Sequence, residues 1–324
     1  MTLPDFFVAG APKAGTSALH AALARHPELS MSRIKEPKYY LCDGRPPPRG
    51  HGPGDPHSSK EWIWERSRYE ALFPTGSTAT LRGESTPFYL SDPGALARIL
   101  RDVPHARFVC VLRDPIDRAY SNWAHLWADG LEPVPDFLAA CAEEERRRKA
   151  GWAPMWRYVG SGRYGEQLQD LYRLVPRERV HLLRYRELVD RPTEAVAAIC
   201  EFLGVAPGLA MEPPGLNVGT YVPPTRVNAV LRASIRGGAA VGSLFPPRYW
   251  RKASVPFLRL LQRSPEHRPD LTPAQREELA GHFVDDVALL ESLTGESFQD
   301  WLGSQGRGTY SVRKSWAPSR REVS

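Results

Sequence analysis

The chain has 324 residues, of which 42% are hydrophobic and 25% charged, the composition of an ordinary globular protein with room for one large α/β domain. Its net charge of +6 suits anionic ligands but is too diffuse to indicate a nucleic-acid-binding protein. The four cysteines form no C-x-x-C pair, the N-terminus lacks the features of a signal peptide, and no apolar run is long enough to span a bilayer. These features predict a cytoplasmic protein without a membrane span.

Short apolar runs alternate with helical patterns along the chain, which predicts an α/β fold with a central parallel sheet and helices on both faces. Asp92 followed by Pro93, and Thr272 followed by Pro273, are typical helix start signals. The expected strands are 5–9, 78–81 (the weakest), 107–112 and 180–183. The expected helices are 16–26, 93–103, 116–127 and 279–290.

Three segments depart from this pattern. Residues 44–60 are rich in Pro, Gly and His, which predicts a long surface loop. Residues 143–149 are charged throughout, as on a solvated helix face. Residues 304–324 are polar and basic, so we expect one domain over 1–303 and a flexible basic tail over 304–324.

The first strand runs into a turn with two glycines, Gly10 and Gly15, and a helix begins directly after it. This arrangement directs free backbone N–H groups and a helix N-terminus at one point, which suits phosphate or sulfate. Gly15 allows the backbone to approach an anion, and Thr16 and Ser17 add hydroxyl donors. A plain glycine turn between a strand and a helix is the alternative interpretation.

The two glycines have the spacing of the nucleotide-triphosphate loop G-x-x-x-x-G-K-[ST], but the lysine is misplaced. Thr16 takes its position, and Lys13 lies inside the loop. The strand 107–112 ends in Arg113 instead of an aspartate for magnesium. A kinase using ATP and magnesium is therefore a weaker hypothesis, although it stays open, as does a non-catalytic module that binds anionic polymers.

Residues 12–17, Pro-Lys-Ala-Gly-Thr-Ser, resemble the 5′-phosphosulfate loop of sulfotransferases. The resemblance implies the P-loop-like sulfotransferase fold and the sulfuryl donor 3′-phosphoadenosine 5′-phosphosulfate (PAPS), with no metal. It also implies that Lys13 contacts the bridging and sulfuryl oxygens. The loop residues that would bind this co-substrate are Lys13, Ala14, Gly15, Thr16 and Ser17.

Residues 107–121 resemble the 3′-phosphate site of the same family. The buried strand delivers Arg113 at the edge of the sheet where open α/β folds bind ligands. The resemblance implies that Arg113 and Ser121 hold the 3′-phosphate; alone, Arg113 would more simply pair with a carboxylate. We expect Arg118 to pair with Asp114 across one helical turn.

Relatives place a basic loop over the 3′-phosphate, in the region that corresponds to 217–250 here. Arg226 and Arg236 are the candidates for this role, although no motif fixes either residue. Arg226 is taken as the first choice.

The acceptor loses a proton during transfer, so a base is expected near the sulfuryl group. Residues 83–89, Gly-Glu-Ser-Thr-Pro-Phe-Tyr, resemble a segment of carbohydrate sulfotransferases that act on heparan sulfate. The resemblance implies that Glu84 is the base; a loop carboxylate or a helix cap is the alternative. His125 and His105 are alternative bases, with His105 expected to be exposed.

Residues 33–40 resemble the K-E-x-x-[YF]-[YF] segment of the same relatives. Lys35 would neutralise the sulfuryl oxygens or lower the pKa of Glu84, unless it is simply exposed. Taken together, the sequence predicts a PAPS-dependent sulfotransferase. Its acceptor is expected to be a hydroxyl of a glycan, glycolipid or glycosylated small metabolite, with residues 44–60 bordering the acceptor site.

Overall fold

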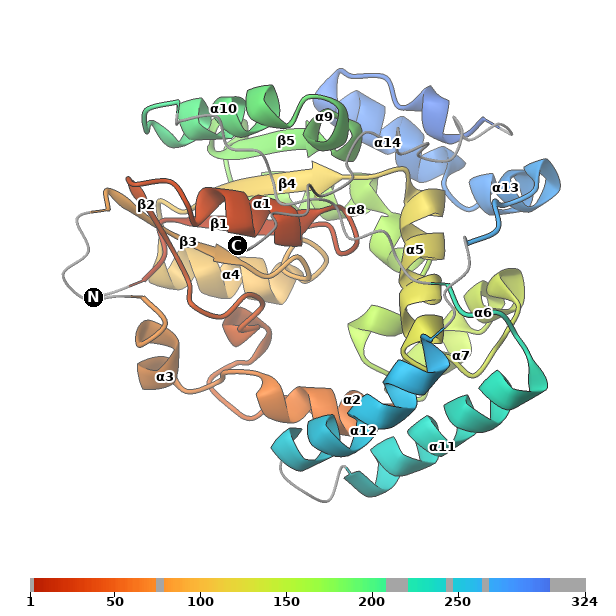
Figure 1. The fold of residues 1–324 in the computed structure, drawn as a ribbon. Coiled ribbons are helices and arrows are strands. Elements are labelled where there is room, and N and C mark those ends of the chain that lie inside the picture. The colour runs from red at the N-terminus through yellow and green to blue at the C-terminus, as the bar shows by residue number, and fades with distance from the viewer. Residues whose placement is uncertain (1–2, 74–78, 208–220, 243–246, 264–267, 304–324) are drawn as a thin grey trace, which may run out of the picture.

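A five-stranded, wholly parallel sheet forms the centre of the molecule in the computed structural model, which describes residues 3–73, 79–207, 221–242, 247–263 and 268–303 (Figure 1). The strand order β2-β3-β1-β4-β5 confirms the predicted α/β class. The strands are β1 (Phe6–Gly10), β2 (Leu29–Met31), β3 (Leu81–Ser85), β4 (Arg107–Leu112) and β5 (Val180–Arg184).

The central strands were predictable because both faces of a parallel sheet are covered, so these strands are continuous apolar runs. All five residues of β1 are buried, and β4 matches the expected range. The expected strand at 78–81 was wrong in position, since β3 begins only at Leu81. The short strand β2 was not predicted at all, because three residues carry too little pattern.

The helices lie on both faces of the sheet (Figure 1). Helix α1 contacts α10 on one face, while α8 contacts α4 and α14 on the other. The expected helix at 279–290 is in fact two, α13 and α14. The α-helices are α1 (Thr16–Leu23), α2 (Asp55–Ser58), α3 (Arg66–Glu70), α4 (Pro93–Asp102), α5 (Pro115–Ala128), α6 (Phe137–Ala142), α7 (Glu144–Lys149), α8 (Tyr164–Leu174), α9 (Tyr185–Asp190), α10 (Pro192–Leu203), α11 (Arg226–Gly242), α12 (Pro247–Leu261), α13 (Pro273–Ala280) and α14 (Val284–Thr294).

Two aspartates begin the helices at the site end of the sheet. The Asp92 carboxylate accepts a hydrogen bond from the Ala95 N–H at 2.8 Å and starts α4. The Asp114 carboxylate accepts from the Ile116 N–H at 2.9 Å and starts α5. Such caps satisfy N–H groups that the helix itself leaves unpaired. None of the described helices is both long and apolar enough to cross a membrane.

The first half of the segment 44–60 is the exposed loop that its composition predicts, but residues 52–59 are partly or fully buried, so the prediction is wrong for the second half. The buried Asp55 accepts hydrogen bonds at 2.8 Å from the N–H groups of Gly52 and Ala153 and from the Trp156 indole. One carboxylate at the start of α2 thus ties the segment to residues 153–156. The prediction failed because these partners lie about a hundred positions away in the sequence.

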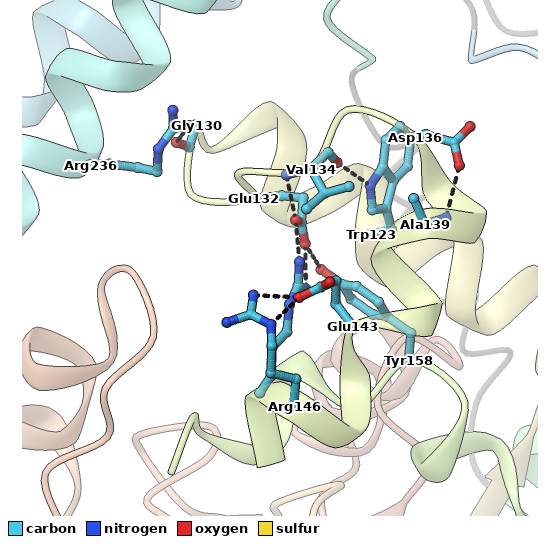
Figure 2. A network of polar contacts seen from close by, with 11 residues as sticks. Trp123, Gly130, Glu132, Val134, Asp136, Ala139, Glu143, Arg146, Tyr158 and Arg236 are labelled. Carbon is cyan, nitrogen blue, oxygen red and sulfur yellow. Dashed lines mark hydrogen bonds and ion pairs between the residues drawn. The ribbon is translucent and has the colours of Figure 1, made fainter. Parts of the chain in front are cut away.

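Helix α7 is largely exposed, as expected, but Arg147 departs from this pattern. Arg147 is fully buried and forms two hydrogen bonds, of 2.9 and 2.7 Å, with the buried Glu132. Figure 2 shows Glu132 also accepting from the Val134 N–H and from the Tyr158 hydroxyl. The additional donors to the Glu132 oxygens offset part of the cost of burying this ion pair.

The predicted pairing of Arg118 with Asp114 was wrong. Arg118 is fully buried and donates a hydrogen bond to the Tyr158 carbonyl, while Asp114 pairs with Arg276 at 2.6 Å. The flexible basic tail was expected over residues 304–324. These residues lie outside the described part of the chain, so the predicted boundary after residue 303 stays a prediction.

We expect Arg147→Met to lower the free energy of unfolding by about 3–5 kcal/mol, because it leaves the Glu132 charge buried and unpaired. Urea unfolding measures this change. The matched control is Arg148→Met on the same helix: Arg148 is exposed and pairs with Glu145, so the change should stay within about 0.5 kcal/mol. The double variant Glu132→Leu, Arg147→Met should recover much of the loss. Equal effects of Arg147→Met and Arg148→Met would contradict this account.

Candidate active site

The loop between β1 and α1 leaves the first turn of α1 without a side-chain cap. Gly15 stands at the N-cap position in the left-handed conformation, with φ of 81°, and Lys13 before it also has a positive φ. The loop is tied to the sheet by the Ala11 N–H, which donates to the Val111 carbonyl at 2.8 Å. Aspartate side chains cap α4 and α5, whereas α1 has no such cap. The first N–H groups of α1 and the positive end of its dipole are therefore suited to an external anion.

The position of Gly15 requires glycine for two reasons. Its positive φ is strained for other residues, and a Cβ atom there would lie 2.9 Å from a ring carbon of Tyr185. Thr16 is buried beside it, whereas Ser17 is exposed. The loop expected from the sequence is therefore present, with its backbone packed closely against α9.

Arg113 at the end of β4 lies directly against this loop. Its Nη1 donates to the Lys13 carbonyl at 3.0 Å, and its guanidinium stacks 4.7 Å from the centre of the Tyr185 ring. The buried Nε–H of Arg113 has no hydrogen-bond partner, and among the described residues no carboxylate lies within ion-pair distance of Arg113. The simpler hypothesis of a carboxylate partner is thus not supported, and Arg113 keeps a donor for a ligand.

Lys13 faces the C-terminal half of α5. Burial lowers the pKa of Lys13 to about 8; the negative charge of Asp129 raises it, and the positive charge of Arg113 lowers it further. Ser121, His125 and Asp129 follow one another at four-residue spacing, so they share one face of the helix region. His125 Nε2 lies 3.6 Å from a carboxylate oxygen of Asp129.

His125 is accessible, because 45% of its side chain is exposed. Burial of the inner part of the ring lowers the pKa of His125, and the positive charge of Lys13 lowers it further. The negative charge of Asp129 raises it. His125 is therefore mainly neutral at neutral pH. His105 is exposed after α4, as expected, and lies on no element of the site.

Glu84 occupies the fourth position of β3, where Phe7 of β1 is its neighbour in register. It is fully buried, and three hydroxyls occupy its oxygens: those of Tyr69 at 2.7 Å, Thr86 at 2.5 Å and Tyr89 at 3.0 Å. Burial raises the pKa of Glu84 to about 7, although the three hydrogen bonds counteract it. A carboxyl with such a pKa exchanges a proton near neutral pH.

Residues 35–38 run past the end of β3 and carry three charges. The Glu36 N–H donates to the Ser85 carbonyl at 2.9 Å, and the Lys38 N–H donates to the Thr86 hydroxyl at 3.3 Å. The Lys35 ammonium forms an ion pair with Glu36, whose other oxygen lies 4.0 Å from the Lys38 ammonium. Lys35 was expected to lower the pKa of Glu84, yet that pKa is raised, and the charge of Glu36 contributes to the rise.

Arg268 was not predicted, because it lies outside the expected range 217–250 and in a segment without periodicity. Its guanidinium stacks 4.3 Å from the centre of the Tyr120 ring, next to Ser121. Burial and the nearby charge of Arg113 lower the pKa of Arg268. By contrast, Arg226 is exposed at the start of α11, and Arg236 donates to the Gly130 carbonyl at 3.3 Å.

One hollow in the described part of the molecule lies away from these residues. It has a volume of about 570 Å³ and is bordered by α6, α8 and α13, with Cys141, Gln167 and His282 in its lining. None of the candidate site residues lines it. The site is therefore defined by charge and by backbone geometry at the edge of the sheet.

These residues fit a donor with two separated anionic groups. The uncapped turn of α1 with Lys13 forms one anchor, and Arg113 with Arg268 forms the other, where the Arg113 Nε–H still lacks a partner. Among the described residues, no three His, Cys, Asp or Glu side chains are grouped so that they could hold a metal ion.

Known proteins resemble this chain in sequence and structure. A model of the sulfotransferase family matches residues 4–207. The bifunctional heparan sulfate N-deacetylase/N-sulfotransferase 2 of Bos taurus is 27% identical over 217 residues, which cover 64% of this chain and 22% of that protein. The heparan sulfate glucosamine 3-O-sulfotransferase 3B1 of Mus musculus is 26% identical over 204 residues, which cover 63% of this chain and 46% of that protein.

The match thus spans less than half of the length of either curated relative. Among solved structures, a sulfotransferase from Alicyclobacillus acidocaldarius superposes with a TM-score of 0.70 at 28% identity and covers 93% of this chain and 99% of that chain. The family model includes the segments 12–17, 83–89 and 107–121 and covers more than half of the residues, so the chain belongs to the sulfotransferase family.

Proposed function

We propose that this chain transfers a sulfuryl group from PAPS to a hydroxyl of a carbohydrate or glycosylated acceptor. One observation carries the proposal: Arg113 binds the carbonyl of Lys13, so two cationic segments a hundred positions apart meet beside an uncapped helix N-terminus. This arrangement matches the two ends of a nucleotide that carries a 5′-phosphosulfate and a 3′-phosphate.

The loop residues would hold the 5′ end of the donor. The N–H groups of Gly15, Thr16 and Ser17, which follow Ala14 at the uncapped start of α1, would donate to its oxygens, and the buried Thr16 would add a hydroxyl. Bound PAPS supplies the sulfuryl group together with a phosphate leaving group. The Lys13 ammonium would then face the charge that grows on this phosphate, and a fixed cation in a partly buried site stabilises such charge strongly.

Arg113, Ser121 and Arg268 would hold the 3′-phosphate. A guanidinium presents donors in a planar fork, which suits phosphate oxygens, and the Arg113 Nε–H is still unpaired. Arg268 is the better candidate for the covering residue because it lies near Arg113, whereas Arg226 remains a prediction that no contact supports.

Glu84 is proposed as the base on the strength of its motif and its raised pKa. The hydroxyl of Thr86 lies between Glu84 and the backbone of Lys38. The acceptor proton would therefore reach Glu84 through this hydroxyl, or directly once residues 35–38 have moved. Lys35 would neutralise sulfuryl oxygens. His125 is the alternative base, favoured by its accessibility and its neutral state.

The acceptor class follows from the relatives, which are named for heparan sulfate. A kinase using ATP and magnesium is less well supported, because Thr16 stands where that loop has its lysine. A module that only binds anionic polymers would not require a carboxyl with a pKa near 7 beside the anion site.

We expect radiolabelled PAPS to label glycosides or oligosaccharides in a screen that also contains phenols and lipids. Lys13→Ala should reduce labelling by about a hundredfold or more, since one lost contact of this kind costs on the order of 3 kcal/mol. Lys149→Ala, an exposed lysine on α7, is the matched control and should leave labelling unchanged. Labelling of phenols alone would overturn the acceptor class, and a fully active Lys13→Ala would overturn the site.

The donor site is tested by calorimetry with two ligands. We expect Arg268→Ala and Arg113→Ala to weaken binding of 3′-phosphoadenosine 5′-phosphate at least about tenfold, the scale of a lost charge-assisted hydrogen bond. Binding of adenosine 5′-phosphosulfate, which lacks the 3′-phosphate, should change little in Arg268→Ala, because the Arg268 guanidinium lies on the Tyr120 ring, beside the proposed 3′-phosphate residue Ser121. Equal weakening of both ligands by Arg268→Ala would place this residue elsewhere.

The base is tested by the pH dependence of kcat/KM. A base acts when deprotonated and Lys13 acts when protonated, so the profile should rise through a pH of about 7 and fall through about 8. Glu84→Gln should lower turnover by about a hundredfold and remove the rising limb, while donor binding survives.

Two variants control this experiment. Tyr69→Phe removes one hydrogen bond to Glu84 and should shift the rising limb upward, because the carboxylate loses a donor. If His125 is the base instead, the rising limb lies below a pH of about 6.5, since the pKa of His125 is lowered, and it disappears in His125→Gln while Glu84→Gln stays active.

A further inference from the structure

The positive charge of this chain is not diffuse but lies largely in one segment. Residues 213–265 contain eight arginines and lysines and no aspartate or glutamate. The rest of the chain has 35 basic and 37 acidic residues, so the net charge of +6 depends on this segment. It includes the helices α11 and α12, which lie side by side at the edge of the molecule farthest from the sheet (Figure 1).

Helix α11 buries Ile235 and Ala239 but departs from an ordinary amphipathic pattern at three other positions. Arg232 is buried, stacks 3.5 Å from the centre of a Trp127 ring and donates to the Val222 carbonyl at 2.9 Å. Val227 and Val230 point outward instead, with 69% and 66% of their surface exposed. A helix with a solvated face normally carries polar residues there. The exposed positions of α11 after Arg226 are Val227, Ala229, Val230, Ala233, Ser234, Gly237 and Ala240.

Helix α12, which packs beside α11, also exposes large apolar side chains. Val255, Phe257 and Leu260 are exposed on it, next to the exposed Arg259 and, just beyond its end, Arg263. Of the eight large hydrophobic side chains exposed in the described part of the chain, five belong to these two helices. We call the five, Val227, Val230, Val255, Phe257 and Leu260, with Arg226, Arg259 and Arg263, the outer face.

We propose that the outer face docks on the surface of an anionic lipid bilayer. Apolar side chains on an interfacial helix enter the boundary between headgroups and acyl chains, while arginines remain among the negatively charged headgroups. Both properties are present on the outer face, and the absence of acidic residues over 213–265 removes the repulsion that such a surface would otherwise exert.

A bilayer fits the outer face better than other occupants do. A second copy docked through the same face would bring two acid-free basic segments together, and their like charges would repel. A nucleic acid would satisfy the arginines but would leave the exposed valines, Phe257 and Leu260 in water. An acidic protein with an apolar groove is the remaining alternative, which the experiment separates.

The test is flotation of the full chain with vesicles of phosphatidylcholine alone or mixed with phosphatidylglycerol. We expect binding to the mixed vesicles only, and weaker binding at high salt, because screening shortens the range of the charges. Phe257→Ser with Leu260→Ser should weaken binding at least about tenfold, since each loses buried apolar area. Arg226→Gln with Arg259→Gln and Arg263→Gln should do the same, at about 1 kcal/mol for each charge.

Val284→Ser is the matched control, because Val284 is equally exposed but lies on α14, outside the outer face. The basic residues of 304–324 are present in every variant, so they do not account for a difference. All substituted positions are exposed, and thermal unfolding checks that each variant is folded. If a serine variant is not folded, the glutamine variant decides.

Three results would overturn the proposal: no binding to mixed vesicles at low salt, equal binding by the outer-face variants and Val284→Ser, or self-association by light scattering that the same variants abolish. The proposal does not depend on sulfuryl transfer, because the vesicle assay contains neither donor nor acceptor.

Discussion

The contact between the Arg113 guanidinium and the Lys13 carbonyl organises the site, because it joins the two loops that leave neighbouring parallel strands. The register of β1 with β4 brings the ends of both strands to the same edge of the sheet. Tyr185 packs against both Gly15 and Arg113, so α9 supports the contact from outside. Every other group of the site is placed relative to this pair: Glu84 by the register of β3 with β1, and His125 by the helix that begins at Asp114.

Local features of the sequence predicted what depends on local structure. The continuous apolar runs gave the positions of β1 and β4 closely, and the two glycines gave the loop before α1. The cap and proline signals at Asp92 and Thr272 gave the starts of α4 and α13. Each of these elements is determined by residues close to it in the sequence. The determinants are an apolar run that is buried on both faces of the sheet, a helix cap, and a backbone conformation that glycine adopts readily.

Features with distant causes could not be predicted in the same way. Asp55 folds the segment around it because its partners come from residues 153–156, and Arg268 reaches the site from beyond the expected range. The motif at 83–89 indicated a carboxylate at the sheet edge, but nothing near it in the sequence shows that Tyr69 would help to enclose it. Burial and charge pairing of this kind are properties of the tertiary structure alone.

The enclosure of Glu84 also affects folding. An unfolded chain would release this proton at a pH near 4.5, whereas the native protein holds it up to about 7. Protonated Glu84 therefore contributes to the free energy of unfolding in acid. This contribution, on the order of 3 kcal/mol, is lost as the pH rises from about 4.5 through about 7. Above neutral pH, the buried, ionised Glu84 thus lowers the stability of the native protein. An uncharged glutamine at the same position would not have this effect.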